Sequence, residues 1–423
     1  MSSDASGVPC AIKDIGLAEG GKRRIEWAFQ SMPVLAAIRK HFIKTQAFSK
    51  IGVAALLPVS AAAANLIITL RDGGAKIAVC GSDAQATEDD VAASLVKDYL
   101  VPVFAVSGAK SEPDTLAMGH LLERQPQLLL DQTGELTAAI AESEERLRSS
   151  VLGVVVETRD RARWVRALAR GGRLGFPVLA SNASLTRRVF HSRIGGGQSA
   201  LDVIIRSLNM LVAGINVVVV GFGAAGRGVA ARAKGLGALV TVTEVDPIRA
   251  LEAAMEGYRV LSMAEAATVG EIFLAASGSR NVIGREHFDK LRNGAILANA
   301  GHSDVEFDLG TLAQIVSSRR PIRAEVEELW LRDGRRIYLL AGGRSIHGAV
   351  GESYPASVLD LSFANRALSA EYLLSSRESL GSGVSGVPLQ IDRQVARFKL
   401  EAMGIKIDRS TVEQEQYLAH SRD

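Results

Sequence analysis

The sequence predicts an α/β protein with two Rossmann-like units, one of them a doubly wound parallel sheet, and a small C-terminal helical tail. Two observations support this prediction. Short apolar runs typical of buried strands alternate with helical stretches along most of the chain, and one such run leads directly into a glycine-rich loop and a helix. The length of 423 residues allows two or three domains, at roughly 150 residues per domain.

The composition is that of an ordinary globular protein, with 47% hydrophobic and 22% charged residues and a formal net charge of +3. The basic residues form no stripe, so we expect no nucleic-acid partner. Cys10 and Cys80 are too few for a disulfide framework and lie in no metal-ligand spacing, which favours a reducing cytoplasmic location and no metal site. The N-terminus has no signal-peptide pattern, and the longest apolar run is too short to span a membrane.

The elements of the first unit follow in order from the hydrophobic pattern. Residues 22–42 are helical by pattern, with Pro33 interrupting the helix. Strands are expected at 50–57, 76–80, 101–106 and 126–131, and helices at 61–74 and 88–100. Gly73 and Gly74 are a suitable stop for the first of these helices.

The second unit begins with a strand, a glycine-rich loop, a helix and a further strand over residues 214–246. We expect strands at 271–277 and 294–301, a short hairpin with its connection at 334–348, and an amphipathic helix at 355–374. The tail is expected to form two short helices, at 395–408 and 410–420. We therefore assign residues 1–190 and 350–385 to the first unit, 191–349 to the second and 386–423 to the tail.

The loop G-F-G-A-A-G places Gly221, Gly223 and Gly226 between a strand and a helix, the context that a dinucleotide-binding loop requires. Gly221 allows the tight turn, Gly223 the close approach of a pyrophosphate, and Gly226 the close packing of helix against strand. The helix N-terminus offers free N–H groups to the phosphates. Glu244 ends the next strand about 20 residues on, where an acid binds the ribose hydroxyls and disfavours a 2′-phosphate. The predicted cofactor is NAD.

The motifs "GFGAAGRG", "TEVDP", "ALEAAMEGY" and "NAGHSDVE" closely resemble the S-adenosylhomocysteine hydrolase (adenosylhomocysteinase) family. The segments at 14–35, 86–95, 128–137 and 362–373 extend this resemblance over nearly the whole chain. It implies a substrate domain beside an NAD domain, a homo-oligomer (dimer or tetramer), and a small-molecule substrate such as a nucleoside. Family members oxidise the 3′-hydroxyl of the substrate ribose, eliminate the thiol, add water and reduce the ketone again.

The same comparison shows where the chain departs from the family. In "PVSAAA", Pro58 stands for the catalytic histidine of the family signature, Ser60 for a threonine and Ala62 for a glutamate. Gln132 stands for the second aspartate of L-D-D-G-G-D-L-T, an acid/base residue, while Asp131 matches the first. Two threonines that contact the nicotinamide end of the cofactor are replaced by Arg159 and Asp160.

Further replacements fall in "NASLTRRVFHS", residues 182–192, which aligns with N-D-S-V-T-K-S-K-F-D-N. In this alignment Val189 replaces the lysine that handles the 3′-hydroxyl, His191 an aspartate and Ser192 a cofactor-contacting asparagine. His347 replaces an asparagine and Tyr354 a histidine. The tail lacks the lysine- and tyrosine-bearing arm that completes a neighbouring subunit's NAD site. The resemblance thus predicts the scaffold without efficient hydrolysis of S-adenosylhomocysteine.

The remaining polar residues give two hypotheses. A divergent NAD-dependent redox enzyme would use Glu157, His191, His302 and His347 as catalytic groups. Its cofactor contacts would be Gly221, Gly223, Gly226, Glu244, Thr158, Asn299 and His302. A non-catalytic relative would keep the fold as a dinucleotide-binding regulator or oligomer partner, with the space facing the nicotinamide filled by Val189, Pro58 and Arg159.

Overall fold

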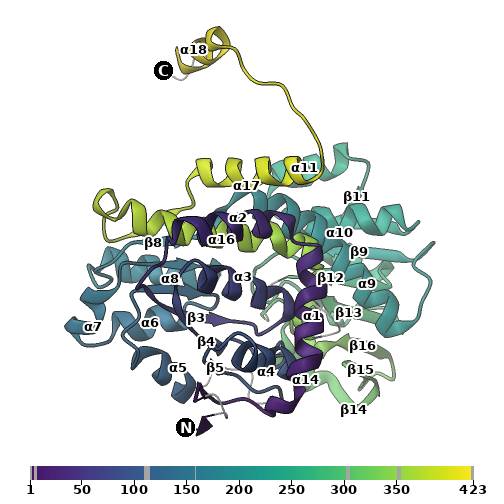
Figure 1. Cartoon of the computed structure of the whole chain (residues 1–423). Coiled ribbons are helices and arrows are strands. Elements are labelled where there is room, and N and C mark those ends of the chain that lie inside the picture. The colour runs from purple at the N-terminus through teal and green to yellow at the C-terminus, as the bar shows by residue number, and fades with distance from the viewer. Residues whose placement is uncertain are drawn as a thin grey trace.

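The computed structural model describes residues 2–3, 7–108, 115–157, 159–301, 305–349 and 354–420. It contains two large sheets, each flanked by helices, which lie side by side in the molecule (Figure 1). The prediction of an α/β protein with two Rossmann-like units is confirmed. Within the described residues no helix is long and apolar enough to cross a membrane.

The first sheet is seven-stranded and parallel, in the order β17-β8-β7-β6-β3-β4-β5. The chain builds outward from β3 in one direction through β4 and β5, and then in the other direction through β6, β7 and β8. The reversal makes the carboxyl ends of β3 and β6 the switch point, where ligands bind in open α/β sheets. The strands are β3 (Gly52–Leu57), β4 (Lys76–Gly81), β5 (Val103–Phe104), β6 (Leu128–Asp131), β7 (Gly153–Val156), β8 (Val178–Ala180) and β17 (Val384–Gly386).

The second sheet is eight-stranded, in the order β11-β10-β9-β12-β13-β16-β15-β14. Its six strands from β11 to β16 are parallel and follow the doubly wound order, and β15 and β14 are added antiparallel at one edge. The strands are β9 (Asn216–Val220), β10 (Leu239–Thr243), β11 (Arg259–Val260), β12 (Ile272–Ala275), β13 (Ala295–Asn299), β14 (Val316–Arg323), β15 (Val326–Leu331) and β16 (Arg336–Leu340).

The prediction of a hairpin within residues 334–348 is wrong. Only β16 lies there, and its antiparallel partner β15 precedes it in the chain. The residues after β16 form the short 3₁₀ turn η4 (Ala341–Gly343) and the helical turn α15 (Ile346–Ala349). Strands β14, β15 and β16 form the antiparallel edge of the second sheet. The turn after β16 lies beside the end of β13, where Asn299 donates to the carbonyl of Gly343.

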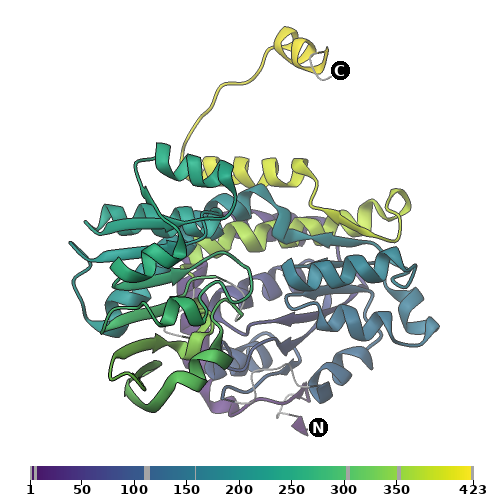
Figure 2. The same cartoon turned by 180° about the vertical axis from the view of Figure 1, so that it is seen from behind.

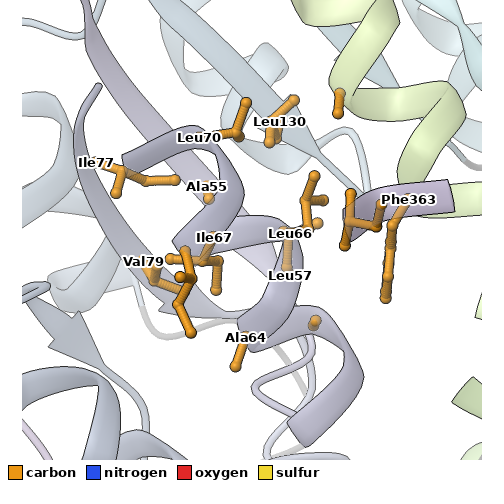
Figure 3. Close-up of a cluster of buried hydrophobic side chains, with 14 of the residues drawn as sticks. Ala55, Leu57, Ala64, Leu66, Ile67, Leu70, Ile77, Val79, Leu130 and Phe363 are labelled. Carbon is orange, nitrogen blue, oxygen red and sulfur yellow. The ribbon is translucent and has the colours of Figure 1, made fainter. Parts of the chain in front are cut away.

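The core of the first unit is centred on α3 (Ala61–Asp72), which packs between the sheet and α16 (Ala356–Ser375). Figure 3 shows Leu66, Ile67 and Leu70 of α3 among the apolar side chains of β3, β4 and β6 and close to Phe363 of α16. Helix α16 has 13 buried residues among its 20, spread around its circumference. It is a central helix and not the amphipathic surface helix that its sequence indicated.

The remaining helices cover the two sheets or join them. The first unit also contains η1 (Ile15–Leu17), α1 (Ala18–Gln30), α2 (Pro33–Thr45), α4 (Asp89–Lys97), α5 (Thr115–Leu122), α6 (Glu135–Ala141), α7 (Glu145–Ser150), α8 (Arg159–Arg170) and η2 (Ser181–Ala183). The second contains α10 (Ala224–Gly235), α11 (Pro247–Met255), α12 (Met263–Val269), α13 (Arg285–Phe288) and α14 (Leu309–Ile315). The two-residue strands β1 (Ser2–Ser3) and β2 (Pro9–Cys10) form a small separate ribbon.

Between the units runs a π-helical segment, η3 (Arg187–Gly195), which continues without a break into α9 (Gly196–Leu208). A π-helix has a wider turn than an α-helix and is frequent at functional sites. Segment η3 packs against α16 on one side and against α10 on the other. It is therefore the element through which the two units contact each other next to the switch points.

The tail helix α17 (Leu389–Ala402) packs on α2 and α16. After it the chain leaves the body of the molecule as an extended segment and ends in α18 (Val412–His420), as both views show (Figures 1 and 2). The first of the two expected tail helices thus begins earlier than predicted, at Leu389.

Candidate functional site

The glycine-rich loop follows β9 with the geometry that its sequence predicted. Gly221 has φ of +97°, and a Cβ there would lie 2.7 Å from the Cα of Ser277. A Cβ on Gly226 would lie 1.9 Å from the carbonyl oxygen of Gly221. Any side chain at either position would therefore collide with backbone, so the turn and the close approach of α10 both depend on glycine.

Gly223 differs because the space above it is open. A Cβ there would meet only the Nη1 of Arg249, at 3.9 Å. The N-terminus of α10 has no side-chain cap, so its first N–H groups are available to an anion. An open cradle at the uncapped N-terminus of a helix fits the pyrophosphate of a dinucleotide.

Glu244 lies directly after β10 with its carboxylate turned toward the same loop. It accepts hydrogen bonds from the backbone N–H of Phe222 at 2.7 Å, of Val245 at 2.7 Å and of Asp246 at 3.0 Å. These bonds fix an acidic group beside the glycine-rich turn, where it fits the ribose hydroxyls of NAD and repels a 2′-phosphate.

Two other predicted cofactor contacts, Thr158 and His302, lie outside the described residues. Asn299 is fully buried at the end of β13. Its Nδ2 donates to the carbonyl of Gly343 and its Oδ1 accepts from the N–H of Gly301 at 2.8 Å. In this structure Asn299 joins the turn after β13 to the turn after β16, so it shapes the switch-point region of the second unit.

The second group of candidate residues lies at the carboxyl ends of β3, β6 and β7 in the first unit. Pro58 follows β3, Gln132 follows β6 and Glu157 follows β7. Asp131 ends β6, and its buried carboxylate accepts from the N–H of Gly134, and from the N–H and hydroxyl of Thr137. It caps the start of α6 and is not directed at the site.

Glu157 is closed in by two arginines. One carboxylate oxygen accepts from Arg187, at 3.1 Å to Nε and 2.9 Å to Nη2, and the other is ion-paired with Arg366 of α16. All three side chains are largely buried, at 7% exposure or less for Glu157 and Arg366 and 13% for Arg187. Burial lowers the pKa of both arginines, that of Arg366 to about 9, so both remain cationic at neutral pH.

Val189, which the hypothesis of a non-catalytic relative places beside the nicotinamide, is not buried against the arginine pair. It is 43% exposed, and Phe190 and Ile194 of the same segment are also exposed. Arg187 and His191, four residues apart, are the side chains that the wide turn of η3 directs inward. The residue of this segment that meets Glu157 is therefore Arg187.

His191, Tyr354 and His347 form a row of rings next to the arginine pair. The centroid of Tyr354 lies 4.1 Å from that of His191 and 4.9 Å from that of His347. His191 Nδ1 is 3.0 Å from the hydroxyl of Ser362 on α16. Burial raises the pKa of Tyr354 well above its ordinary value, so its phenol is protonated at neutral pH.

The tautomer of His347 follows from its partners. Its Nε2 lies 3.2 Å from the carbonyl oxygen of Ala300, which can only accept, so Nε2 carries the proton. Its Nδ1 then accepts from the hydroxyl of Ser199, at 3.1 Å. Burial lowers the pKa of His347 to about 4, and the ring is neutral at pH 7.

A cavity of about 980 Å³ opens between the two units beside these rings. Ser60, Ala61 and Ala62 at the start of α3 line one wall, and Ser199 of α9 and Tyr354 line another. Arg24 on α1 also lines it, paired with Glu88 at 3.0 Å and Asp90 at 3.1 Å. The cavity has the volume of a small-molecule site, and Tyr354 is the member of the ring row that lines it.

Sequence reasoning missed two residues that build this site, Arg366 and Asp392; it had identified Arg187, with Arg188 and Arg159, as a candidate anion-binding residue, against the more common case of a solvated arginine-rich helix start. Asp392 of α17 is buried and accepts hydrogen bonds from Ser184, Leu185, Thr186 and Asn365. It fixes the three residues before η3 and therefore the direction in which Arg187 leaves the backbone. Within the part of the chain that the structure describes, no three His, Cys, Asp or Glu side chains gather as metal ligands.

Two family models match the chain. Residues 9–161 match S-adenosyl-L-homocysteine hydrolase, and residues 193–352 match the NAD-binding domain of S-adenosyl-L-homocysteine hydrolase. The open cradle at Gly223 and the acid at Glu244 agree with NAD as the cofactor of this chain.

Curated proteins extend the similarity over nearly the full length. The adenosylhomocysteinase of Aquifex aeolicus is 46% identical over 408 residues, which cover 96% of this chain and 98% of that protein. Those of Thermosynechococcus vestitus and Sulfurisphaera tokodaii are 43% and 44% identical, covering 96% and 97% of this chain and 95% and 98% of theirs. With this identity over this length, the chain belongs to the S-adenosyl-L-homocysteine hydrolase (adenosylhomocysteinase) family.

Proposed function

We propose that this chain is an NAD-dependent enzyme that oxidises a hydroxyl group of a small molecule bound between the two units. The substrate is a nucleoside or another hydroxylated compound, and S-adenosylhomocysteine is at most a poor substrate for hydrolysis. The observation that supports the proposal is the row of His191, Tyr354 and His347, of which Tyr354 lines the 980 Å³ cavity and the two histidines lie buried behind it. It supplies proton-transfer groups next to a cleft that has lost the family's own set.

The chemistry requires that a proton leave the substrate hydroxyl as its carbon is oxidised. NAD, when bound, supplies the hydride acceptor. A base is most effective with a pKa near the working pH, so His347, with a pKa of about 4, is too weak for this task. Its fixed Nδ1 instead orients the hydroxyl of Ser199, which lines the cavity. Among the ring row, His191 is the residue that we assign as the base.

The altered wall of the cavity supports a change of substrate. Ser60 is the N-cap of α3, its hydroxyl accepting from the N–H of Ala63 at 3.3 Å, and Ala62 has no polar side-chain atom. The residues that stand for the family's histidine and glutamate, Pro58 and Ala62, have no side chain that moves a proton. We therefore expect this chain to bind adenine less tightly than its relatives do.

A second function, that of a non-catalytic NAD-binding partner, is favoured by one observation. Glu157, the one surviving candidate base among the carboxylates, is held between Arg187 and Arg366 and is 6% exposed. A carboxylate in two ion pairs is a weak base. If the substrate does not separate Glu157 from these arginines, catalysis depends on the ring row alone.

The two functions differ in one experiment. Purified protein is mixed with NAD and a panel of nucleosides that includes adenosine and S-adenosylhomocysteine, and the absorbance of reduced nicotinamide and the release of homocysteine are followed. We expect reduction with at least one hydroxylated ligand, loss of that signal in His191→Ala, and little homocysteine. A matched control is His120→Ala, on α5 away from the site. Reduction with none of the ligands would favour the non-catalytic partner.

We also propose a division of the chain at residues 190, 350 and 385, a cytoplasmic homo-oligomer, and catalytic roles for Glu157 and His302, whereas His347 acts through the hydroxyl of Ser199. The cofactor contacts proposed are the three loop glycines, Glu244, Thr158, Asn299 and His302.

A further inference from the structure

The buried cluster beside the ring row has an excess of positive charge. Arg187 and Arg366 share the single carboxylate of Glu157. Arg366 is 5% exposed and Glu157 is 6% exposed. A buried charge without a counter-charge is costly, and buried arginines are normally paired in full. Among the residues that the structure describes, one of the two cations in this cluster therefore has no counter-charge of its own.

The second guanidinium nitrogen of Arg366 shows where the counter-charge is missing. Its Nη2 is paired with Glu157 and lies 3.4 Å from the amide oxygen of Gln132. Its Nη1 is buried and has no hydrogen-bond partner among the described residues. Asp131, next to Gln132 in the chain, directs both oxygens at Gly134 and Thr137 and neutralises neither arginine.

Most of the charge-changing differences from the family make the site more positive, whereas Val189 for a lysine and Asp160 for a threonine make it more negative. Ala62 stands for a glutamate, and Gln132 and His191 stand for aspartates. Arg366 falls where the family's S-F-x-N-Q helix has glutamine. The chain has thus removed three carboxylates from the substrate side and added a buried cation, which suits a ligand of opposite charge.

We propose that Arg187 and Arg366 form a subsite for an anionic group of the substrate, a carboxylate or a phosphate. A guanidinium presents two parallel N–H donors that match the oxygens of either group. The bound anion would take the unpartnered Nη1 of Arg366 and compete with Glu157 for the shared donors. This inference rests on the proposed function, since it specifies which hydroxylated compounds the site accepts.

The subsite can be tested without a known substrate by titrating inorganic phosphate, and separately malonate, into protein saturated with NAD. Saturation fills the glycine-rich loop, which would otherwise bind phosphate itself. Binding is followed by calorimetry and by the rise in Tm at constant ionic strength. We expect saturable binding of at least one anion, and the stronger of the two identifies the group.

Three variants locate the site. Arg366→Gln, which keeps Glu157 paired with Arg187, should weaken binding about tenfold to a hundredfold, the worth of one or two charge-assisted hydrogen bonds. Glu157→Gln should tighten it, because the competing carboxylate is gone. Arg285→Gln, an exposed arginine paired with Asp289 on α13, is the matched control and should bind as the wild type does.

Equal binding by wild type and Arg366→Gln, or weaker binding by Glu157→Gln, would overturn the subsite. The result for the anion subsite can be distinguished from the result for the proposed redox function. Anion binding that depends on Arg366 without any reduction of NAD would leave the subsite standing and the redox function refuted. Oxidation of adenosine as fast as adenosine 5′-monophosphate and carboxylated analogues, in both wild type and Arg366→Gln, would do the reverse.

Discussion

Arg187 donates from both Nε and Nη2 to the same oxygen of Glu157, at 3.1 and 2.9 Å, and leaves the other oxygen to Arg366. The carboxylate is thus the centre of a buried triad that joins β7, η3 and α16. Its three members come from segments far apart in the sequence. The triad therefore holds η3, the segment that contacts the second unit, against β7 and α16 of the first unit.

The triad predicts unequal costs for removing its members. Glu157→Met leaves two buried cations unpaired and should reduce the free energy of unfolding by about 3–5 kcal/mol. Arg187→Met leaves a one-to-one pair of Glu157 with Arg366 and should cost less, about 1–2 kcal/mol. Urea denaturation of the two variants measures both values. Equal losses would show that the cluster is not short of negative charge.

The glycine-rich loop predicts a variant that loses NAD without losing stability. In Gly223→Ala the new methyl group meets no protein atom closer than 3.9 Å, but it would project into the pyrophosphate cradle. NAD affinity should fall by about tenfold or more, with Tm unchanged. Gly235→Ala, at the far end of the same helix with nothing within 4 Å, is the control. Equal NAD affinity in both variants would place the pyrophosphate elsewhere.

His347 predicts a loss of stability in weak acid. Its pKa of about 4 in the folded state lies below the ordinary value of 6.5, so the unfolded chain binds the proton more readily. Stability is therefore fully present above pH 6.5 and falls as the pH drops from 6.5 toward 4, by up to about 3 kcal/mol. His347→Gln should flatten the unfolding free energy over this window. A wild-type resonance of His347 that titrates near pH 6.5 would contradict the assignment.

Asp392 predicts a coupling between the tail and the site. Asp392→Ala removes the acceptor of five hydrogen bonds from residues 184–186 and Asn365. We expect a loss of about 3 kcal/mol of stability. Amide exchange should become faster across η3, because its first turn is no longer fixed. An effect confined to α17 would mean that Asp392 stabilises only its own helix.

The parts of the fold that depend on local pattern could be predicted from the sequence. The strands at β3, β4, β9 and β13 follow from apolar runs, and the loop at Gly221 follows from its spacing between a strand and a helix. Strand β14 was missed because its exposed residues "VSSRRPIR" include a proline and three arginines, which are typical of an edge strand or a loop. Helix α16 was predicted as amphipathic, but 13 of its 20 residues are buried.

The interior of the site could be predicted only in part. Glu157 and His191 were identified as candidates, but their contacts with Arg366 and Ser362 of α16 were not predicted. A sequence alignment cannot show which side chains of a π-helix point inward, because the turn of a π-helix is wider than that of an α-helix. Arg366 did leave a signal, a single arginine in the middle of an apolar helix where the family has glutamine, and such a residue needs a partner.

We propose that this chain transfers a hydride from a hydroxylated ligand to NAD, with proton-transfer groups that differ from those of the family. The most direct measurement is a single-turnover mixing of the NAD-saturated protein with adenosine, adenosine 5′-monophosphate and S-adenosylhomocysteine, followed at the absorbance of reduced nicotinamide. We expect a rise that is absent in His191→Ala, without stoichiometric release of homocysteine. No rise with any ligand, or a rise with S-adenosylhomocysteine that His191→Ala retains and that releases homocysteine, would contradict it.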